Sequence, residues 1–205
     1  MFLEADAHDR WQGRALRLQF ATIAWNVGEA VLTIGLGIAA ASLALVGFGA
    51  DSIIEIFASL VVVWYLAPRH RVERQARTSL ALRLVAGAFL ALALVLGLTA
   101  LRDLVTGRRP GESPWGIAYL AITAIVMLAL AAAKRRVAGQ LDSAPLRSEA
   151  TMTFLDAILA TATLSGLTLN AALGWWWADP AAALLVAVAA GNEARENWKE
   201  AAELG

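Results

Sequence analysis

The sequence contains no cysteine, only two histidines and few charged residues. The absence of cysteine excludes disulfide bonds, thiolate metal sites and cysteine nucleophiles. Charged residues make up 17% of the chain, whereas about a quarter is usual in a soluble domain, so an ordinary cytoplasmic enzyme is not expected. Basic and acidic residues are equal in number, and the basic surplus of a nucleic-acid-binding protein is missing. The histidines, His8 and His70, fall outside the apolar stretches, and we expect them on the surface.

Hydrophobic residues are abundant, at 59% of 205 positions, and the mean hydropathy is +0.61. Apolar stretches recur at the length of about 20 residues that crosses a bilayer. They predict an all-α polytopic membrane protein with six transmembrane helices. A break at residues 39–42 separates the first two stretches, and Asp179 is expected to cap the sixth helix ahead of Pro180. The predicted spans are residues 15–38, 42–66, 80–101, 115–133, 148–170 and 178–194.

These spans form one predicted transmembrane domain, residues 15–194. It follows a short cytoplasmic segment, 1–14, and precedes a short cytoplasmic tail, 195–205. The first ten residues are acidic rather than basic, so we expect no cleavable signal peptide. The remaining residues are too few for a large soluble domain. The tail is expected to continue the sixth span as an amphipathic helix.

Lysine and arginine are distributed asymmetrically between the predicted loops. By the positive-inside rule, the richer side is cytoplasmic, and both termini are expected there. High alanine and arginine usage is typical of a multi-pass protein of a bacterial inner membrane. The richer side receives Arg10, Arg14, Arg17, Arg69, Arg71, Arg74, Arg77, Arg83, Lys134, Arg135, Arg136, Arg147, Arg195 and Lys199. The poorer side receives Arg102, Arg108 and Arg109.

Several acidic residues lie inside the predicted spans. Glu29 is in the first, Asp51 and Glu55 are in the second, and Asp156 is in the fifth. An ionised acid at the centre of a membrane helix costs about 2.5–3.5 kcal/mol. These side chains are therefore expected to face one another, water or a cation.

The spacing of the polar residues supports a shared site. Asp51 and Glu55 are four residues apart, so they share one face of their helix. Glu149 and Asp156 are seven apart and also share a face, as do Asn26 and Glu29 at a spacing of three. With a rise of about 1.5 Å per residue, the central acids fall near the middle of the bilayer.

Clustered carboxylates in a low dielectric bind protons, and a divalent cation displaces those protons. A midplane site of this kind in a bundle that opens alternately to each side gives metal/proton antiport. Proton relays and aspartyl proteases also place acids in membranes. Individual roles stay open: Glu149 also fits a solvated helix start, Glu29 a proton site, Asn26 an interhelical hydrogen bond and Met152 simple packing.

Three segments resemble the cation diffusion facilitators, a family of cation efflux transporters. Residues 43–55 (LALVGFGADSIIE) are similar to its second span, and residues 148–157 (SEATMTFLDA) to its fifth. Residues 174–180 (GWWWADP) are similar to the loop into its sixth span. The resemblance implies six spans with cytoplasmic termini. It also implies a transporter rather than an enzyme, one that exports a divalent transition metal in exchange for protons.

The resemblance also implies a site. The family's ligands fall on Asp51, Glu55 and Asp156, while a fourth falls on Met152, where a thioether is a poor ligand for a hard ion. Glu149, Asn26, Glu29 or water is expected to replace it, with Asn26 and Glu29 otherwise in proton coupling. Oxygen ligands favour manganese or iron, and zinc also accepts them. No prosthetic group is expected.

The remaining expectations concern how the chain assembles and which other functions its acidic residues fit. We expect the cytoplasmic C-terminal domain that helps most members dimerise to be missing, so a homodimer is expected to form through the membrane helices or the short tail. One alternative function is a transport-incompetent metal-binding membrane module or partner subunit. Another is an intramembrane aspartyl protease with Asp51 and Asp156 as its dyad. Glu55 separates that protease from a cation site, because only a cation site uses it.

Overall fold

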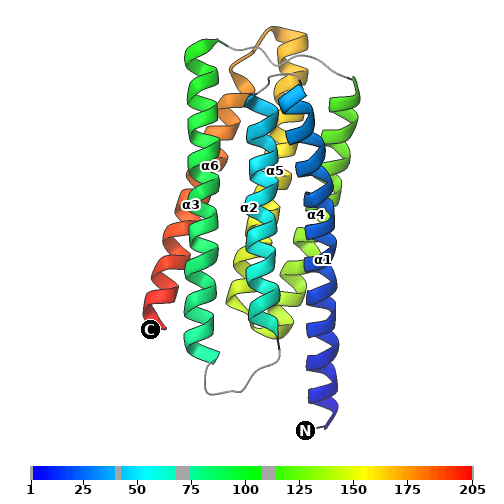
Figure 1. Cartoon of the computed structure of the whole chain (residues 1–205), viewed down its shortest axis with the longest axis vertical. Coiled ribbons are helices and arrows are strands. Elements are labelled where there is room, and N and C mark those ends of the chain that lie inside the picture. Colours follow the sequence, from blue (N-terminus) through cyan, green and yellow to red (C-terminus); the bar gives the residue numbers. More distant parts are fainter. Residues whose placement is uncertain (1, 40–42, 68–73, 108–113, 205) are drawn as a thin grey trace.

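The computed structural model describes residues 2–39, 43–67, 74–107 and 114–204, and the described chain is almost entirely helical. Six long helices run roughly along one axis (Figure 1). The all-α architecture predicted from the apolar stretches is therefore confirmed. The helices are α1 (Phe2–Ala39), α2 (Leu43–Leu66), α3 (Arg74–Thr106), α4 (Pro114–Leu141), α5 (Ala144–Leu173) and α6 (Ala178–Glu203).

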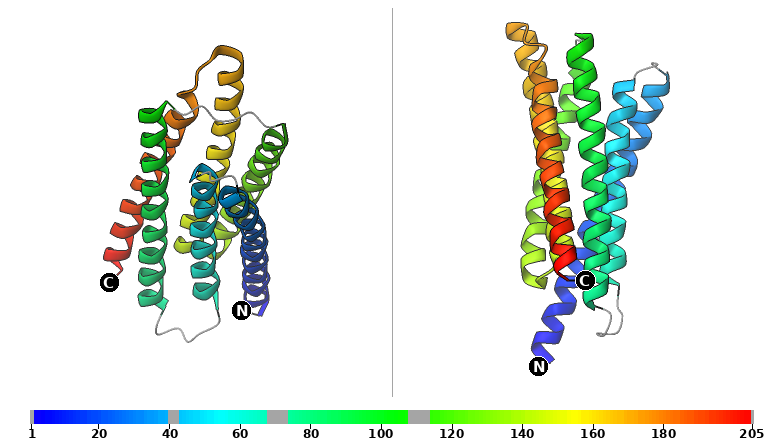
Figure 2. Two further views of the ribbon diagram at one scale, coloured as in Figure 1. Left: turned by 45° about the horizontal axis from the view of Figure 1, so that its top comes forward. Right: turned by 90° about the vertical axis from the view of Figure 1, so that its left-hand side faces the viewer.

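The helices associate as three close pairs: α1 with α2, α4 with α5, and α3 with α6. Helix α1 also contacts α4, and α5 also contacts α2, so these four helices surround a common interior. The pair α3 and α6 packs beside them, through an apolar cluster that includes Phe89 of α3 and Val186 of α6. Both chain termini lie toward the same end of the bundle, here called the termini end (Figures 1 and 2). The opposite end is called the far end.

Helix α5, which carries two of the predicted site residues, has defined ends. Asp142 adopts a positive φ of 45°, and Ser143 then caps the helix by accepting a hydrogen bond from the backbone N–H of Leu146. Gly174 ends the helix at φ 69° and donates its N–H to the carbonyl of Asn170. These caps fix where α5 starts and stops relative to α4.

The bundle exposes large apolar side chains and buries several charged ones alongside its apolar clusters. Large hydrophobic side chains such as Val31, Leu98 and Leu185 are more than half exposed, while several carboxylates are buried. Such a distribution suits a protein whose surroundings are lipid. By length and hydropathy, four described segments qualify as membrane spans: Gly49–Leu66, Gln75–Thr106, Ala118–Leu141 and Ala144–Asn170. Helices α1 and α6 do not qualify among them.

The helix boundaries refine the predicted spans. Helix α1 ends and α2 begins on either side of the predicted break, although residues 40–42 lie outside the described residues, as does His70. Helix α1 starts well before residue 15, so the predicted N-terminal segment is helical, and His8 on it is exposed. Helix α6 continues through the predicted tail to Glu203.

The predicted capping role of Asp179 is wrong. Trp177 is the N-cap of α6 and makes no side-chain capping bond, while Asp179 lies within the first helical turn. Its carboxylate instead accepts a hydrogen bond from the Thr163 side chain on α5. The reason is the close approach of the two helices, since Gly166 has no side chain and lies against the backbone of Asp179.

Candidate cation site

Helices α1, α2, α4 and α5 bring polar side chains together along the interior in three levels. Because neighbouring helices run in opposite directions, residues late in α2 and α4 meet residues early in α1 and α5. The termini level contains Gln19, Ser59, Lys134 and Glu149. The middle level contains Asn26, Glu55 and Thr153. The far level contains Glu29, Asp51, Tyr119 and Asp156.

The termini level is centred on Glu149, which is fully buried. Its Oε1 accepts hydrogen bonds from Lys134 Nζ at 2.5 Å and from Ser59 Oγ at 2.9 Å. Its Oε2 accepts one from Gln19 Nε2 at 2.8 Å. Lys134 is itself fully buried. Four helices thus converge on one carboxylate whose charge a lysine balances.

The middle level is centred on Glu55. Its Oε2 accepts a hydrogen bond from Asn26 Nδ2 at 3.1 Å, and its Oε1 accepts one from Thr153 Oγ1 at 2.5 Å. Lys134 Nζ donates to the same Thr153 oxygen at 2.8 Å. Thr153 therefore links the buried ion pair of the termini level to Glu55.

The far level contains three carboxyl groups. Asp51 and Asp156 are paired by a side-chain hydrogen bond. Glu29 accepts a hydrogen bond from Tyr119 Oη at 2.6 Å and interacts with the Ser52 hydroxyl. Oδ2 of Asp156 is buried and has no hydrogen-bond partner within the described part of the chain.

The six predicted site residues all point inward. The exposed fractions are 1% for Asn26, 4% for Glu29, 7% for Asp51, 3% for Glu55, 0% for Glu149 and 8% for Asp156. The expectation that these side chains avoid lipid is met at every position. The alternative of a solvated helix start for Glu149 is wrong, because its carboxylate is enclosed by hydrogen-bond donors. Asn26 makes the interhelical hydrogen bond that its alternative interpretation predicts.

Met152 packs among apolar side chains. It is buried in the apolar cluster formed with α3 and α6, among side chains such as Phe89 and Val85. Its packing role agrees with the alternative raised for it from the sequence.

Sequence reasoning missed Lys134 and Tyr119. The charge tally placed Lys134 among loop residues on the richer side, which is wrong, because its side chain is buried in an ion pair. A signal was present: Lys134 and Glu149 lie about two helical turns on either side of the α4–α5 turn, and an antiparallel hairpin brings such positions together. Tyr119 sits in an apolar run and gave no comparable signal.

In this conformation the carboxylates are divided between levels. Within the described residues, no three or more His, Cys, Asp or Glu side chains are grouped so that they could hold one metal ion. Glu55 is turned toward Asn26 and Thr153, whereas Asp51 and Asp156 bond to each other. Convergence on one ion requires Glu55 to exchange those partners.

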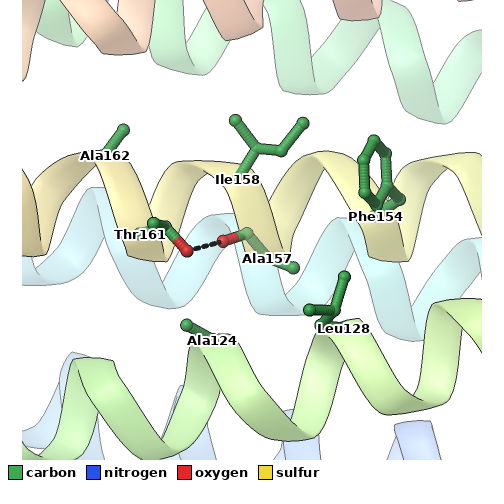
Figure 3. Close-up of a pocket in the computed structure, with 7 residues that line it drawn as sticks. All are labelled: Ala124, Leu128, Phe154, Ala157, Ile158, Thr161 and Ala162. Carbon is green, nitrogen blue, oxygen red and sulfur yellow. Dashed lines mark hydrogen bonds between the residues drawn. The ribbon is translucent and has the colours of Figure 1, made fainter.

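An apolar hollow between α4 and α5 offers no alternative site. Its volume is about 250 Å³, and its lining is made of Ala124, Leu128, Phe154, Ala157, Ile158, Thr161 and Ala162 (Figure 3). Its one hydroxyl, on Thr161, donates back to the carbonyl of Ala157 at 2.8 Å. The hollow therefore presents no free cation ligand.

Helices with apolar outer faces around a buried file of acids define a multi-pass α-helical membrane protein with a polar centre. A family model described as the cation efflux transmembrane domain matches residues 20–204. The chain belongs to this family of cation transporters, which confirms the resemblance found in the three sequence segments. Comparison with curated proteins gives no match.

Proposed function

We propose that the protein exports a divalent transition-metal ion in exchange for protons by alternating access. Asp51, Glu55 and Asp156 are the proposed primary ligands. The observation that carries this proposal is the burial of these three carboxyl groups at adjacent levels of the interior of a cation efflux domain. Buried acids are costly unless they are protonated, paired with a cation or bound to a metal, and exchange between the protonated state and the metal-bound state is antiport.

The donor atoms favour a hard or borderline cation. Within the described interior, side chains at the middle and far levels offer carboxyl, amide and hydroxyl oxygens, while Met152 is packed elsewhere. Such oxygens suit manganese and iron, and zinc accepts carboxylate oxygen as well. We propose one of these three ions as the substrate.

Binding and proton release are coupled through the existing hydrogen bonds. Asp51 and Asp156 are hydrogen-bonded to each other, and any proton held between them must leave when both carboxylates face a cation. Glu55 must turn from Asn26 and Thr153 toward the same ion. Glu29, held by Tyr119, is positioned to receive a proton at the far level, and Asn26 orients Glu55.

The cellular arrangement is also a proposal. We place the protein in a bacterial inner membrane with both termini in the cytoplasm, which agrees with their position at one end of the bundle (Figure 1). A homodimer would form through the membrane helices. In this orientation the Lys134–Glu149 pair lies between the cytoplasm and the proposed ligands.

One alternative draws support from a specific contact. The hydrogen bond between Asp51 and Asp156 is also the pairing that an intramembrane aspartyl protease requires. Such an enzyme has no use for Glu55. Loss of transport in Glu55→Gln supports the transporter, whereas peptide cleavage in detergent that Asp51→Asn abolishes supports the protease.

The direct test is metal uptake into inverted membrane vesicles with an imposed pH gradient. We expect accumulation of Mn²⁺, Fe²⁺ or Zn²⁺ that collapses when the gradient is dissipated. Metal binding without this gradient dependence would instead indicate a binding module or partner subunit. Equal uptake by the wild type and Asp156→Asn would show that the site is wrongly assigned.

A further inference from the structure

The Lys134 ammonium lies in an oxygen-lined position that resembles a cation site. Its Nζ contacts Glu149 Oε1 at 2.5 Å and Thr153 Oγ1 at 2.8 Å, and Ser59 and Gln19 also bond to Glu149. In the described part of the chain, Lys134 is the only buried lysine or arginine. A lysine here is costly to bury, and it is paired as a bound cation would be.

A second observation also points to a cation. Among the described residues, each level of the interior includes a buried acceptor oxygen without a hydrogen-bond partner: Gln19 Oε1, Asn26 Oδ1 and Asp156 Oδ2. The amide nitrogens of Gln19 and Asn26 are already committed to Glu149 and Glu55, so the free atoms of these amides are acceptors only. An unpaired acceptor in a low dielectric is costly, and a hydrogen-bond donor or a cation would satisfy it.

We propose that Lys134 is a tethered cation filling a second cation position, formed by Glu149, Thr153, Ser59 and Gln19. Glu149 precedes Asp156 by seven residues, or about 10 Å along the helix, so this position is distinct from the far-level carboxyl groups, and Thr153 links it to Glu55. An ion moving between the termini end and Asp51 must displace the ammonium from Glu149. That last step rests on the proposed function, whereas the existence of the second position does not.

The test removes the tethered charge and counts bound ions. Mn²⁺ binding to the purified full chain is measured by the loss of the aqueous Mn²⁺ electron paramagnetic resonance signal. Lys134→Met is expected to bind one more Mn²⁺ per chain than the wild type, since carboxylate, hydroxyl and amide oxygens suit this ion. Adding Glu149→Gln to Lys134→Met is expected to remove the gained ion. A folded Lys134→Met with the wild-type ion count overturns the proposal.

A matched control is available on the surface. Lys199 pairs with Glu196 at 3.0 Å, and both side chains are exposed. Lys199→Met is expected to gain no ion, because water already satisfies the freed carboxylate. A gain there equal to that of Lys134→Met would mean that loss of any lysine recruits Mn²⁺, and would overturn the proposal.

Stability gives an independent measurement if Lys134→Met folds poorly. Mn²⁺ is expected to raise the melting temperature of Lys134→Met more than that of Lys134→Met/Glu149→Gln, because binding to the folded state stabilises it. Lys134→Gln, whose amide can still donate to Glu149, repeats the ion count. If neither variant gains an ion or Mn²⁺-dependent stability, the second position does not exist.

The two proposals fail in different ways. If the transport assignment is wrong, the wild type shows no proton-driven uptake, yet Lys134→Met still gains its ion and retains it when Asp51→Asn is added. If the second position is wrong, the wild type transports and Lys134→Met gains nothing.

Discussion

The termini level and the far level of the polar interior differ in how their charges are balanced. At the termini level, the Glu149 carboxylate has a lysine partner and three hydrogen-bond donors in all. At the far level, Asp51, Asp156 and Glu29 lie together with only hydroxyls and one another as partners. Burial is nearly complete at both levels.

The termini level is charge-balanced, whereas the far level needs protons or a metal ion to balance its charge. A buried carboxylate with a cation and satisfied lone pairs has no further requirement. A buried group of carboxyls without a cation must retain protons or acquire a metal. Acids that are equally buried therefore need not have the same function. The position of Lys134 determines which buried carboxylate is charge-balanced and which carboxyl groups need protons or a metal. The predictions below test this contrast, beginning with the largest effect.

The far level should be indispensable for transport. Asp51→Asn and Asp156→Asn each replace a proposed ligand with a neutral group of the same shape. We expect proton-driven metal uptake into vesicles to fall by roughly 100-fold or more, since even supporting partners of a metal site are worth 10- to 100-fold. Asp142→Asn is the control, because Asp142 is exposed at the α4–α5 turn. Uptake at the wild-type level in both far-level variants would refute the contrast.

The termini level should matter mainly for stability. Lys134→Met leaves the Glu149 charge buried without a partner, which costs about 3–5 kcal/mol. In metal-free detergent solution, we expect a marked fall in the melting temperature. The charge-balanced double variant Lys134→Met/Glu149→Gln should recover most of the loss.

The matched surface change calibrates this result. Lys199→Met removes an exposed partner of Glu196 and should leave the melting temperature nearly unchanged. If Lys134→Met lowers the melting temperature no more than Lys199→Met does, the buried pair contributes no more to stability than a surface pair. The proposed charge balance at the termini level would then be refuted.

The close packing of α5 against α6 should contribute less to stability than the buried ion pair. A methyl group added at Gly166 would lie 2.9 Å from the backbone N and Cα of Asp179, so α5 and α6 would have to separate. We expect Gly166→Ala to destabilise the protein by about 1–3 kcal/mol. Gly139→Ala in α4 is the control, since nothing lies within 4 Å of the added atom. A thermal unfolding series in detergent compares the two, and equal melting temperatures would contradict the close contact.

Much of the fold was accessible from the sequence. Membrane helices are defined by length and hydropathy, and these placed six helices and the break between α1 and α2. The exact helix ends were not accessible. Whether a helix continues beyond the apolar run depends on contacts such as that of Ser79 with the carbonyl of Ala201, which ties α3 to the last turns of α6.

The burial of the site residues could also be predicted from the sequence, because an acid in an apolar run has few alternatives to facing inward. The side chains that they contact were harder to predict. Lys134 was assigned to a loop because the positive-inside rule counts residues without seeing hairpin geometry. The separation of Glu55 from Asp51 depends on Asn26 and Thr153, whose hydrogen bonds involve residues far apart in the chain. No local pattern encodes that choice.

Tyr119 tests the far level most finely. Tyr119 is half-buried on α4, and its hydroxyl donates a hydrogen bond to Glu29 Oε1 at 2.6 Å. This bond connects α4 to the carboxyl groups of the far level. Tyr119→Phe deletes this bond and keeps the ring, and a hydrogen bond of this kind is worth about 0.5–1.5 kcal/mol. We expect vesicle uptake to fall by about 2- to 10-fold, the same free energy expressed as a rate ratio. Glu29→Gln should abolish the difference between Tyr and Phe at position 119, because no carboxylate remains to be held. If Tyr119→Phe lowers uptake equally in both backgrounds, Tyr119 acts through packing rather than through Glu29.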